Sequence, residues 1–216
     1  MQNQKPKIGD NLTVTRNFQT LAVSCAKEET VIRGILCKSE KILSADLYAL
    51  DLRGSVLQNC VFEDCGFEKA SFSDVIFKDC NFSGCTFSES WFGRCRFENC
   101  KAVGAEFLEA VLKHTEMENC NFSYAVFDRT QWENAVLKAG KFDDASFAQT
   151  IWKSMYLADS SFVKNNFFQS KLGNVSFADC QFLAPTVSAH GEELRGVQIS
   201  AQQAVDLIGI FGLKVI

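Results

Sequence analysis

A large hydrophobic residue recurs at every fifth position between Leu47 and Phe182, with no break in the register. Phe fills 17 of these 28 positions, and only one of them holds a small residue. Two residues before each lies a second special position, where 25 of 28 residues are small and the exceptions are Leu50, Met155 and Asn165. Because neither position ever carries a charge, the repeat predicts two inward and three outward residues in every pentamer.

A period of five residues fits neither the 3.6-residue turn of an α-helix nor the two-residue alternation of a strand. The pattern therefore predicts a solenoid, in which flat faces of five residues stack on the equivalent faces of the next coil. In the second half of the array, two Phe followed mostly by other residues recur every 20 residues, as in Phe122, Phe127, Trp132 and Leu137. Four pentamers per coil is the simplest interpretation, and it gives about seven coils in a rod roughly 34 Å long.

The repeat resembles a known family. The segment SADLYALDLRG at residues 44–54 and the long succession of Cys-x-Phe triplets are similar to the A(D/N)LXX consensus of pentapeptide-repeat proteins. The resemblance covers residues 45–183 and implies an all-β fold, a right-handed quadrilateral β-helix. We therefore expect three segments: residues 1–44 as an N-terminal cap or degenerate first coils, residues 45–183 as the β-helix, and residues 184–216 as a C-terminal segment.

The C-terminal segment is expected to contain a short α-helix. Ser200 and Gln203 fit a capping box, and Gly212 is placed to end the helix. Its apolar face and the residues after it need a covering partner, which is either the last coil, as a simple cap, or a second copy of the protein. The predicted dimer interface consists of Ala204, Leu207, Ile208, Phe211, Leu213 and Val215.

The tail also resembles one subgroup of that family. Gln203, Ala204, Leu207, Gly212 and Leu213 fit the QAxxLxxxLGI ending of quinolone-resistance (Qnr-type) proteins. This resemblance implies a head-to-head homodimer through the C-terminus. It also implies a DNA mimic that occupies the DNA-binding saddle of a type II topoisomerase, DNA gyrase or topoisomerase IV, and opposes quinolones. Several Qnr-type relatives carry loops between coils, and this array has none.

The sequence contains very few candidate catalytic residues. The only His residues are His114 and His190, and the sequence contains no P-loop, GxGxxG or HExxH motif. The carboxylates are scattered over outward positions. We therefore predict that the protein is not an enzyme and has no catalytic, cofactor-binding or metal-binding residues.

Four cysteines, Cys60, Cys80, Cys100 and Cys120, are spaced 20 residues apart and should form one column. The column could form a metal or redox ladder, but Cys alternates here with Ala, Ser and Thr, and a disulfide would require closer Cβ atoms than stacked coils provide. The interpretation we favour is a corner filler with free thiols. Residues 1–10 lack the apolar core of a secretory signal, and no apolar run is long enough for a membrane span, so we expect a cytoplasmic protein.

The outward charges are distributed unevenly. The net charge of the chain is −4, which disfavours direct nucleic-acid binding and favours a partner that itself binds nucleic acid. The predicted acidic contact surface consists of Asp46, Glu68, Glu89, Glu106, Glu109 and Asp128, with Glu98, Glu116 and Glu118 as neighbours. The alternative function is a structural or regulatory scaffold, whose unknown partner contacts a different stripe: Trp91, Val111 and Ile151.

Overall fold

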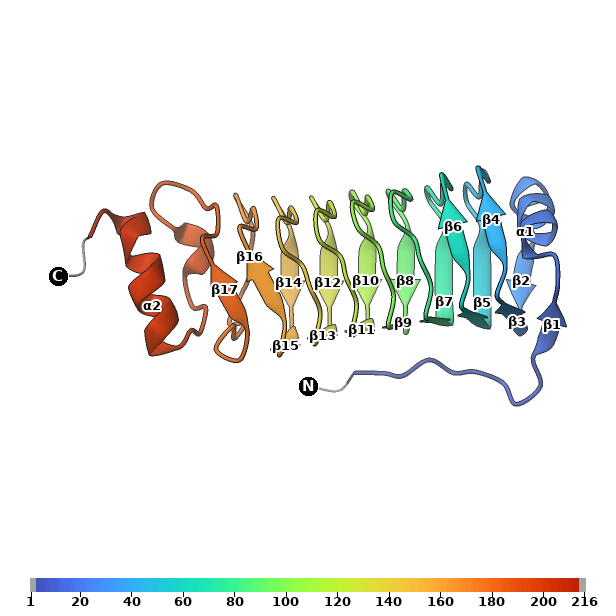
Figure 1. Cartoon of the computed structure of the whole chain (residues 1–216), viewed down its shortest axis with the longest axis horizontal. Coiled ribbons are helices and arrows are strands. Elements are labelled where there is room, and N and C mark those ends of the chain that lie inside the picture. The colour runs from blue at the N-terminus through green and yellow to red at the C-terminus, as the bar shows by residue number, and fades with distance from the viewer. Residues whose placement is uncertain (1–2, 214–216) are drawn as a thin grey trace.

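The computed structural model of the chain describes residues 3–213. It is a parallel β-solenoid of about nine turns, with a helix at each end (Figure 1). The seven regular coils predicted from the repeat are thus extended at both ends. None of the described helices has the length and apolar character needed to cross a bilayer.

Each coil has four faces, which we number 1 to 4 after the inward residues Leu52, Leu57, Phe62 and Phe67 and their equivalents at steps of 20. Face 1 contains β2 (Val31–Arg33), β8 (Trp91–Gly93), β10 (Val111–Lys113), β12 (Gln131–Glu133) and β14 (Ile151–Lys153). Face 2 contains β1 (Thr13–Thr15), β3 (Ile35–Lys38), β9 (Arg96–Glu98), β11 (Glu116–Glu118), β13 (Val136–Lys138) and β15 (Tyr156–Ala158). The longer strands β5 (Asp51–Gln58) and β7 (Ser71–Lys78) run through both faces.

Faces 3 and 4 have fewer formal strands. Face 3 contains β4 (Lys41–Leu43), β6 (Val61–Glu63), β16 (Ser161–Val163) and β17 (Gln181–Leu183). Face 4 is joined by single parallel bridges, from Asp46–Gly66 at one end to Asn166–Thr186 at the other. The ends of the chain contain α1 (Phe18–Lys27), α2 (Ala201–Leu207) and two 3-10 turns, η1 (Glu192–Leu194) and η2 (Ile208–Phe211).

The register between coils is 20 residues, as the sequence predicts. Val111 pairs with Gln131 in parallel, and Gln131 pairs with Ile151. The same register already holds before the regular array, because Val31 pairs with Asp51 and β4 pairs with β6. Corners are made by residues with positive φ, such as Asn59 at 54°.

Aromatic stacking fills the interior. On face 4, the rings of Phe67 and Phe87 lie 4.7 Å apart at an angle of 3°, and the rings of Phe107 and Phe127 lie 4.8 Å apart at 19°. Phe127 also stacks on Phe147 at 5.0 Å. Rings on adjacent faces often meet edge to face, as Phe82 and Phe87 do at an angle of 73°.

The helix α1 closes the N-terminal end of the solenoid. Asn17 caps it by accepting a hydrogen bond from the Thr20 N–H, and the buried Phe18 lies edge-on to Phe62 at 6.2 Å. The side-chain amide of Gln19 both donates to the Leu43 carbonyl and accepts from its N–H. The open edge of β4 is therefore paired by a side chain.

Replacing Phe127 by Ala should remove one ring from the middle of the face 4 stack. We expect the free energy of unfolding to fall by about 3–5 kcal/mol, because the cavity adds to the lost transfer energy. Urea unfolding monitored by circular dichroism measures the change. Lys101→Ala, at an exposed outward position, should change stability by less than about 0.5 kcal/mol, and equal effects of the two variants would contradict the inward assignment.

Candidate functional site

The predicted acidic residues do not form one surface. Asp46, Glu68, Glu89, Glu106, Glu109 and Asp128 lie on face 4, whereas Glu98, Glu116 and Glu118 lie on face 2. The two faces are ten residues apart in a coil of 20, so they lie on opposite sides of the rod. The proximity that the sequence analysis gave to these two groups was therefore wrong.

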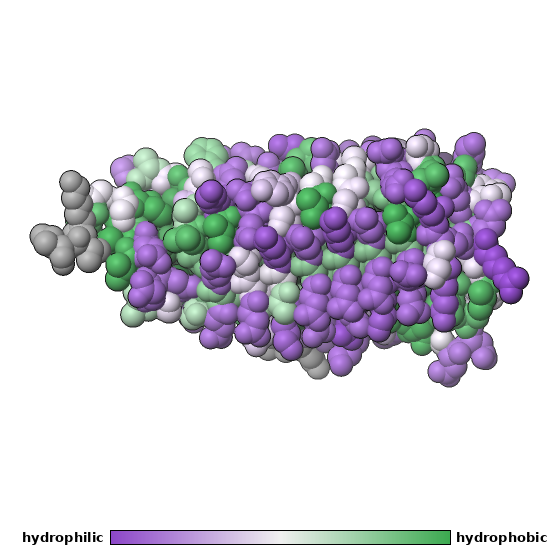
Figure 2. All heavy atoms as spheres, in the orientation of Figure 1, coloured by the Kyte–Doolittle hydropathy of each residue, from purple (hydrophilic) through white to green (hydrophobic). Residues whose placement is uncertain are grey.

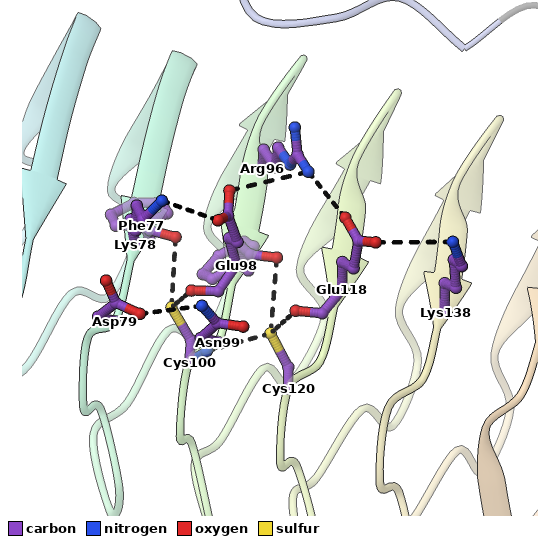
Figure 3. Close-up of polar contacts among 11 residues, drawn as sticks. Phe77, Lys78, Asp79, Arg96, Glu98, Asn99, Cys100, Glu118, Cys120 and Lys138 are labelled. Carbon is purple, nitrogen blue, oxygen red and sulfur yellow. Dashed lines mark hydrogen bonds and ion pairs between the residues drawn. The ribbon is translucent and has the colours of Figure 1, made fainter.

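Two of the face 2 glutamates are occupied by ion pairs within the chain (Figure 3). Glu98 contacts Lys78 at 2.9 Å and Arg96 at 3.7 Å, and Glu118 contacts Arg96 at 2.7 Å and Lys138 at 3.7 Å. The hydrogen bond from Lys78 to Glu98 raises the pKa of Lys78. These five residues carry three positive and two negative charges, so Glu98 and Glu118 add no net negative charge to this face.

On face 4, two acidic residues are paired with bases of adjacent coils. Lys69 Nζ lies 3.7 Å from Glu89 Oε2, and Arg129 Nε lies 2.7 Å from Glu109 Oε1. Both pairs are exposed, so each contributes little to stability. Their charges cancel in pairs.

The other acidic residues of face 4 keep their negative charge. Glu68 accepts a hydrogen bond from the Thr86 hydroxyl, and Asp128 accepts from Ser146 Oγ at 2.5 Å. These bonds to the next coil orient both carboxylates without neutralising them.

Asp46 accepts from the Tyr48 N–H at 3.1 Å. Glu106 is exposed and makes no ion pair with any residue that the structure describes. With Glu68 and Asp128, these residues leave four carboxylates on face 4 without an ion-pair partner among the described residues. Face 2 also keeps carboxylates outside the ion pairs, namely Asp79, Glu116, Asp159 and Asp179.

The ion pairs could have been found from the sequence. Lys78 and Glu98, Lys69 and Glu89, and Glu109 and Arg129 are each separated by one coil of 20 residues. The net charge of a face does not reveal this pairing. A comparison of each outward residue with the residues 20 positions before and after it distinguishes carboxylates that have a basic neighbour from those that do not.

All ten cysteines are free thiols, and eight are buried. Cys80, Cys100 and Cys120 donate to backbone carbonyls of the preceding coil, and Cys37 and Cys60 bring their sulfurs within 3.5 Å. Burial raises the pKa of the Cys85 and Cys95 thiols to about 12, which disfavours the reactive thiolate. Across residues 3–213, no three His, Cys, Asp or Glu side chains are grouped in a way that could hold a metal ion.

The apolar column of face 1 is interrupted. Trp91, Val111, Gln131 and Ile151 lie in register, so a polar residue separates the predicted stripe into two parts. Trp91 is 39% exposed and its indole lies against Gly93, where a Cβ would be only 2.8 Å from Nε1. Lys113 Nζ lies 5.5 Å from the indole ring, in cation–π range.

The helix α2 is fastened to the last coil by Gln203 and Leu207. Gln203 Nε2 donates to the carbonyls of Phe177 and Cys180 at 2.9 and 2.7 Å, and its Oε1 accepts from the Ser200 N–H. The predicted capping box is present, and Leu207 is only 4% exposed. These contacts make the helix a cap of its own solenoid.

An open apolar hollow of about 310 Å³ remains beside this cap. Hydrophobic atoms gather at this end of the molecule in Figure 2. Of the predicted dimer residues, Ala204 and Ile208 line the hollow with Leu207, and Leu213 is 57% exposed. The side chain of Phe211 and the whole of Val215 lie outside the described residues. Leu194, Val197 and Ile199 complete the lining.

Glu193 organises the loop before α2. Its buried carboxylate accepts from the Gln169 N–H at 2.7 Å and from the Ser188 N–H and hydroxyl at 3.1 and 2.8 Å. Burial alone would raise the pKa of Glu193, but the hydrogen bonds outweigh it, and the pKa lies below its ordinary value. Glu193 therefore stabilises the fold above the unfolded pKa of about 4.3.

Replacing Glu193 by Gln should lower the melting temperature at pH 7, because the charged acceptor is lost. The difference from the wild type should shrink as the pH falls below about 4.3 and through the lowered folded pKa. Thermal unfolding between pH 3 and 7 measures both effects. The exposed Glu192→Gln is the control, and a Glu193 effect that does not depend on pH would contradict the role of the charge.

Comparisons with known proteins agree with this architecture. A sequence model described as "Pentapeptide repeat region" matches residues 90–167, and another described as "Pentapeptide repeats (9 copies)" matches residues 48–115. Together they span more than half of the chain. No curated protein matches its sequence.

Solved structures are similar at low sequence identity. Two trypsin-treated variants of QnrB1, a plasmid-mediated fluoroquinolone resistance protein, are 22% and 21% identical, with TM-scores of 0.50 and 0.51. Each alignment covers 86% of this chain, and 91% and 93% of the QnrB1 chains. HetL, a pentapeptide repeat protein involved in heterocyst differentiation regulation in Nostoc sp. strain PCC 7120, is 12% identical over 77% of this chain and 87% of its own, with a TM-score of 0.37. The likeness to QnrB1 shows the fold alone.

Proposed function

The chain belongs to the pentapeptide-repeat family, and from that premise we propose that it is a non-enzymatic DNA mimic that binds a type II topoisomerase. The proposed target is DNA gyrase, and topoisomerase IV is the second proposed target. The observation that carries the proposal is the set of unbalanced carboxylates on face 4, Asp46, Glu68, Glu106 and Asp128. They form one side of a rigid rod, and the adjacent face 1 carries five basic and three acidic residues between Asp51 and Asn174.

The size of the rod supports this assignment. About nine turns at roughly 4.8 Å each make a rod about 43 Å long. Two rods joined at their C-terminal ends would reach roughly 85 Å, the length of about 25 base pairs of B-DNA at 3.4 Å per pair. A dimer therefore has the length needed to cross a DNA-binding surface from one side to the other.

The charge is modest compared with that of DNA. A duplex of 43 Å carries about 25 phosphate charges, whereas face 4 presents four unbalanced carboxylates. Shape must therefore contribute much of the fit, and charge should act chiefly on orientation and association rate. Asp46 and Glu106 are exposed, and Glu68 and Asp128 are half-buried, so all four are reached by solvent ions and binding should weaken as salt is raised.

QnrB1 is a plasmid-mediated fluoroquinolone resistance protein, and the similarity to it supports quinolone protection as the proposed biological effect. The continuous 20-residue register of residues 47–182 leaves no inserted loop between coils. Between residues 47 and 182, the protein thus offers the topoisomerase only the faces and corners of the rod. A supercoiling assay with and without a quinolone distinguishes protection from simple inhibition.

We expect Glu106→Lys to weaken gyrase binding and to reduce the effect of the protein on supercoiling about tenfold or more. The matched control is Glu116→Lys, which changes the same outward position and the same net charge on the opposite face. Both glutamates are outside the ion pairs described above. Equal losses in the two variants would contradict a role for face 4 in particular, and no effect of the native protein on gyrase or topoisomerase IV would refute the proposal.

The homodimer is part of the proposal, because the apolar hollow at α2 is open. Ala204→Glu places a charge in its lining and should convert the dimer to a monomer, as measured by light scattering at micromolar concentration. Gln202→Glu adds the same charge at another exposed position of α2 and should leave the dimer intact. A wild-type protein that is already monomeric would refute this part.

The alternative is a scaffold whose partner contacts Trp91 and Val111 on face 1. The exposure of Trp91 favours it. A pull-down that is lost in Trp91→Ala but retained in Glu106→Lys would support this function over the first.

A further inference from the structure

The N-terminal segment lies outside the solenoid. Residues 3–12 contain no strand or helix and run back along the coils from β1, as Figure 1 shows. We call this segment the N-terminal arm. Two hydrogen bonds attach it: the Lys7 N–H donates to Asp74 Oδ1 at 2.9 Å, and the Gln4 N–H donates to His114 Nδ1 at 3.4 Å. Asp74 and His114 are two coils apart.

The arm follows one corner of the rod, between faces 1 and 2. The last outward residues of face 1 form this corner, and in successive coils they are Gly34, Gly54, Asp74, Arg94 and His114. The first two lack side chains and have positive φ angles of 62° and 55°. The Lys7 carbonyl oxygen lies 3.8 Å from the place of a Cβ at Gly54, so the arm lies close to bare backbone there. A hollow of about 470 Å³ remains between the arm and the corner.

The carboxylate of Asp74 is oriented by Arg94 so that it can accept a hydrogen bond from the arm. Arg94 binds its carboxylate through two hydrogen bonds, Nε to Oδ1 at 2.7 Å and Nη2 to Oδ2 at 2.6 Å. Burial would raise the pKa of Asp74, but Arg94 and the Lys7 N–H lower it below its ordinary value. The carboxylate is therefore ionised and fixed in direction at neutral pH.

The arm is held through its backbone. Both donors are main-chain N–H groups, and the side chains of Lys5 and Lys7 are exposed, while Pro6 and Ile8 are half-buried. An attachment of this kind selects an extended conformation more than a particular set of side chains. Two hydrogen bonds at exposed sites contribute only about 1 kcal/mol each, so the arm can exchange with another segment.

We infer that this corner is a second interaction site, a groove that takes an extended, proline-containing peptide segment of a partner protein. The N-terminal arm contains the sequence Lys-Pro-Lys. It occupies the groove in this structure and would compete with the partner segment for it. The site is diagonally opposite the corner between faces 3 and 4 and does not border face 4. It therefore acts independently of topoisomerase binding and can be tested without a topoisomerase.

The experiment uses the full chain and a fluorescent peptide with the sequence of residues 3–10. Lys7→Pro removes the N–H that donates to Asp74 but leaves the groove intact, so it should release the arm. A tethered competitor acts at an effective concentration of about 1 mM. For a peptide with an intrinsic Kd of about 0.1 mM, release of the arm should tighten apparent binding about tenfold, as measured by fluorescence anisotropy.

Asp74→Asn in the Lys7→Pro background should abolish this gain. Asp64→Asn should not, since Asp64 has the same positive φ on a different corner. As a second measurement, trypsin should cut after Lys7 faster in full-length Asp74→Asn than in the wild type. Equal peptide binding by the wild type and Lys7→Pro, or equal cleavage in the wild type and Asp74→Asn, would overturn the inference.

Discussion

Each coil of this protein is completed by the coils on either side of it. On face 4, the Phe87 N–H donates to the Glu106 carbonyl one coil later, and the Glu106 N–H donates back to the Cys85 carbonyl. This exchange pairs the backbone groups only where successive turns have the same length, which in this array is 20 residues. The stacked Phe rings, the small residues at the corners and the columns of outward charges all follow from that constant length.

The sequence predicted the regular array well and its beginning poorly, for a reason that particular residues show. Ile32 and Ile42 occupy inward positions in the correct register, but Glu40 stands where a small residue is expected. Its carboxylate accepts the Phe18 N–H at 2.7 Å and so holds the start of α1. Glu40 thus breaks the five-residue pattern in the first coil, and the same carboxylate attaches α1 to that coil.

The candidate surface was predicted less completely than the fold. Inward positions are set by burial, which a one-dimensional period reveals, whereas the meaning of an outward charge depends on the coils above and below it. Glu98 and Glu106 look alike in the sequence, but Glu98 lies between Lys78 and Arg96, and Glu106 has no such neighbours among the described residues. Likewise, the five-residue period does not indicate that Asp74 accepts a hydrogen bond from the N–H of Lys7, which lies 67 residues earlier in the chain.

The two terminal coils of the solenoid are covered in different ways, so the two ends of the rod are not equivalent. At the first coil, α1 and the amide of Gln19 close the end and pair the edge of β4. At the last coil, Gln203 satisfies the final carbonyls, but the apolar hollow beside Ala204 stays open. In the proposed dimer, contact between two such C-terminal ends would cover both hollows and leave the capped ends outward, so association would stop at two copies instead of growing into a filament. The end that leaves apolar side chains uncovered would thus set the length of the proposed dimer.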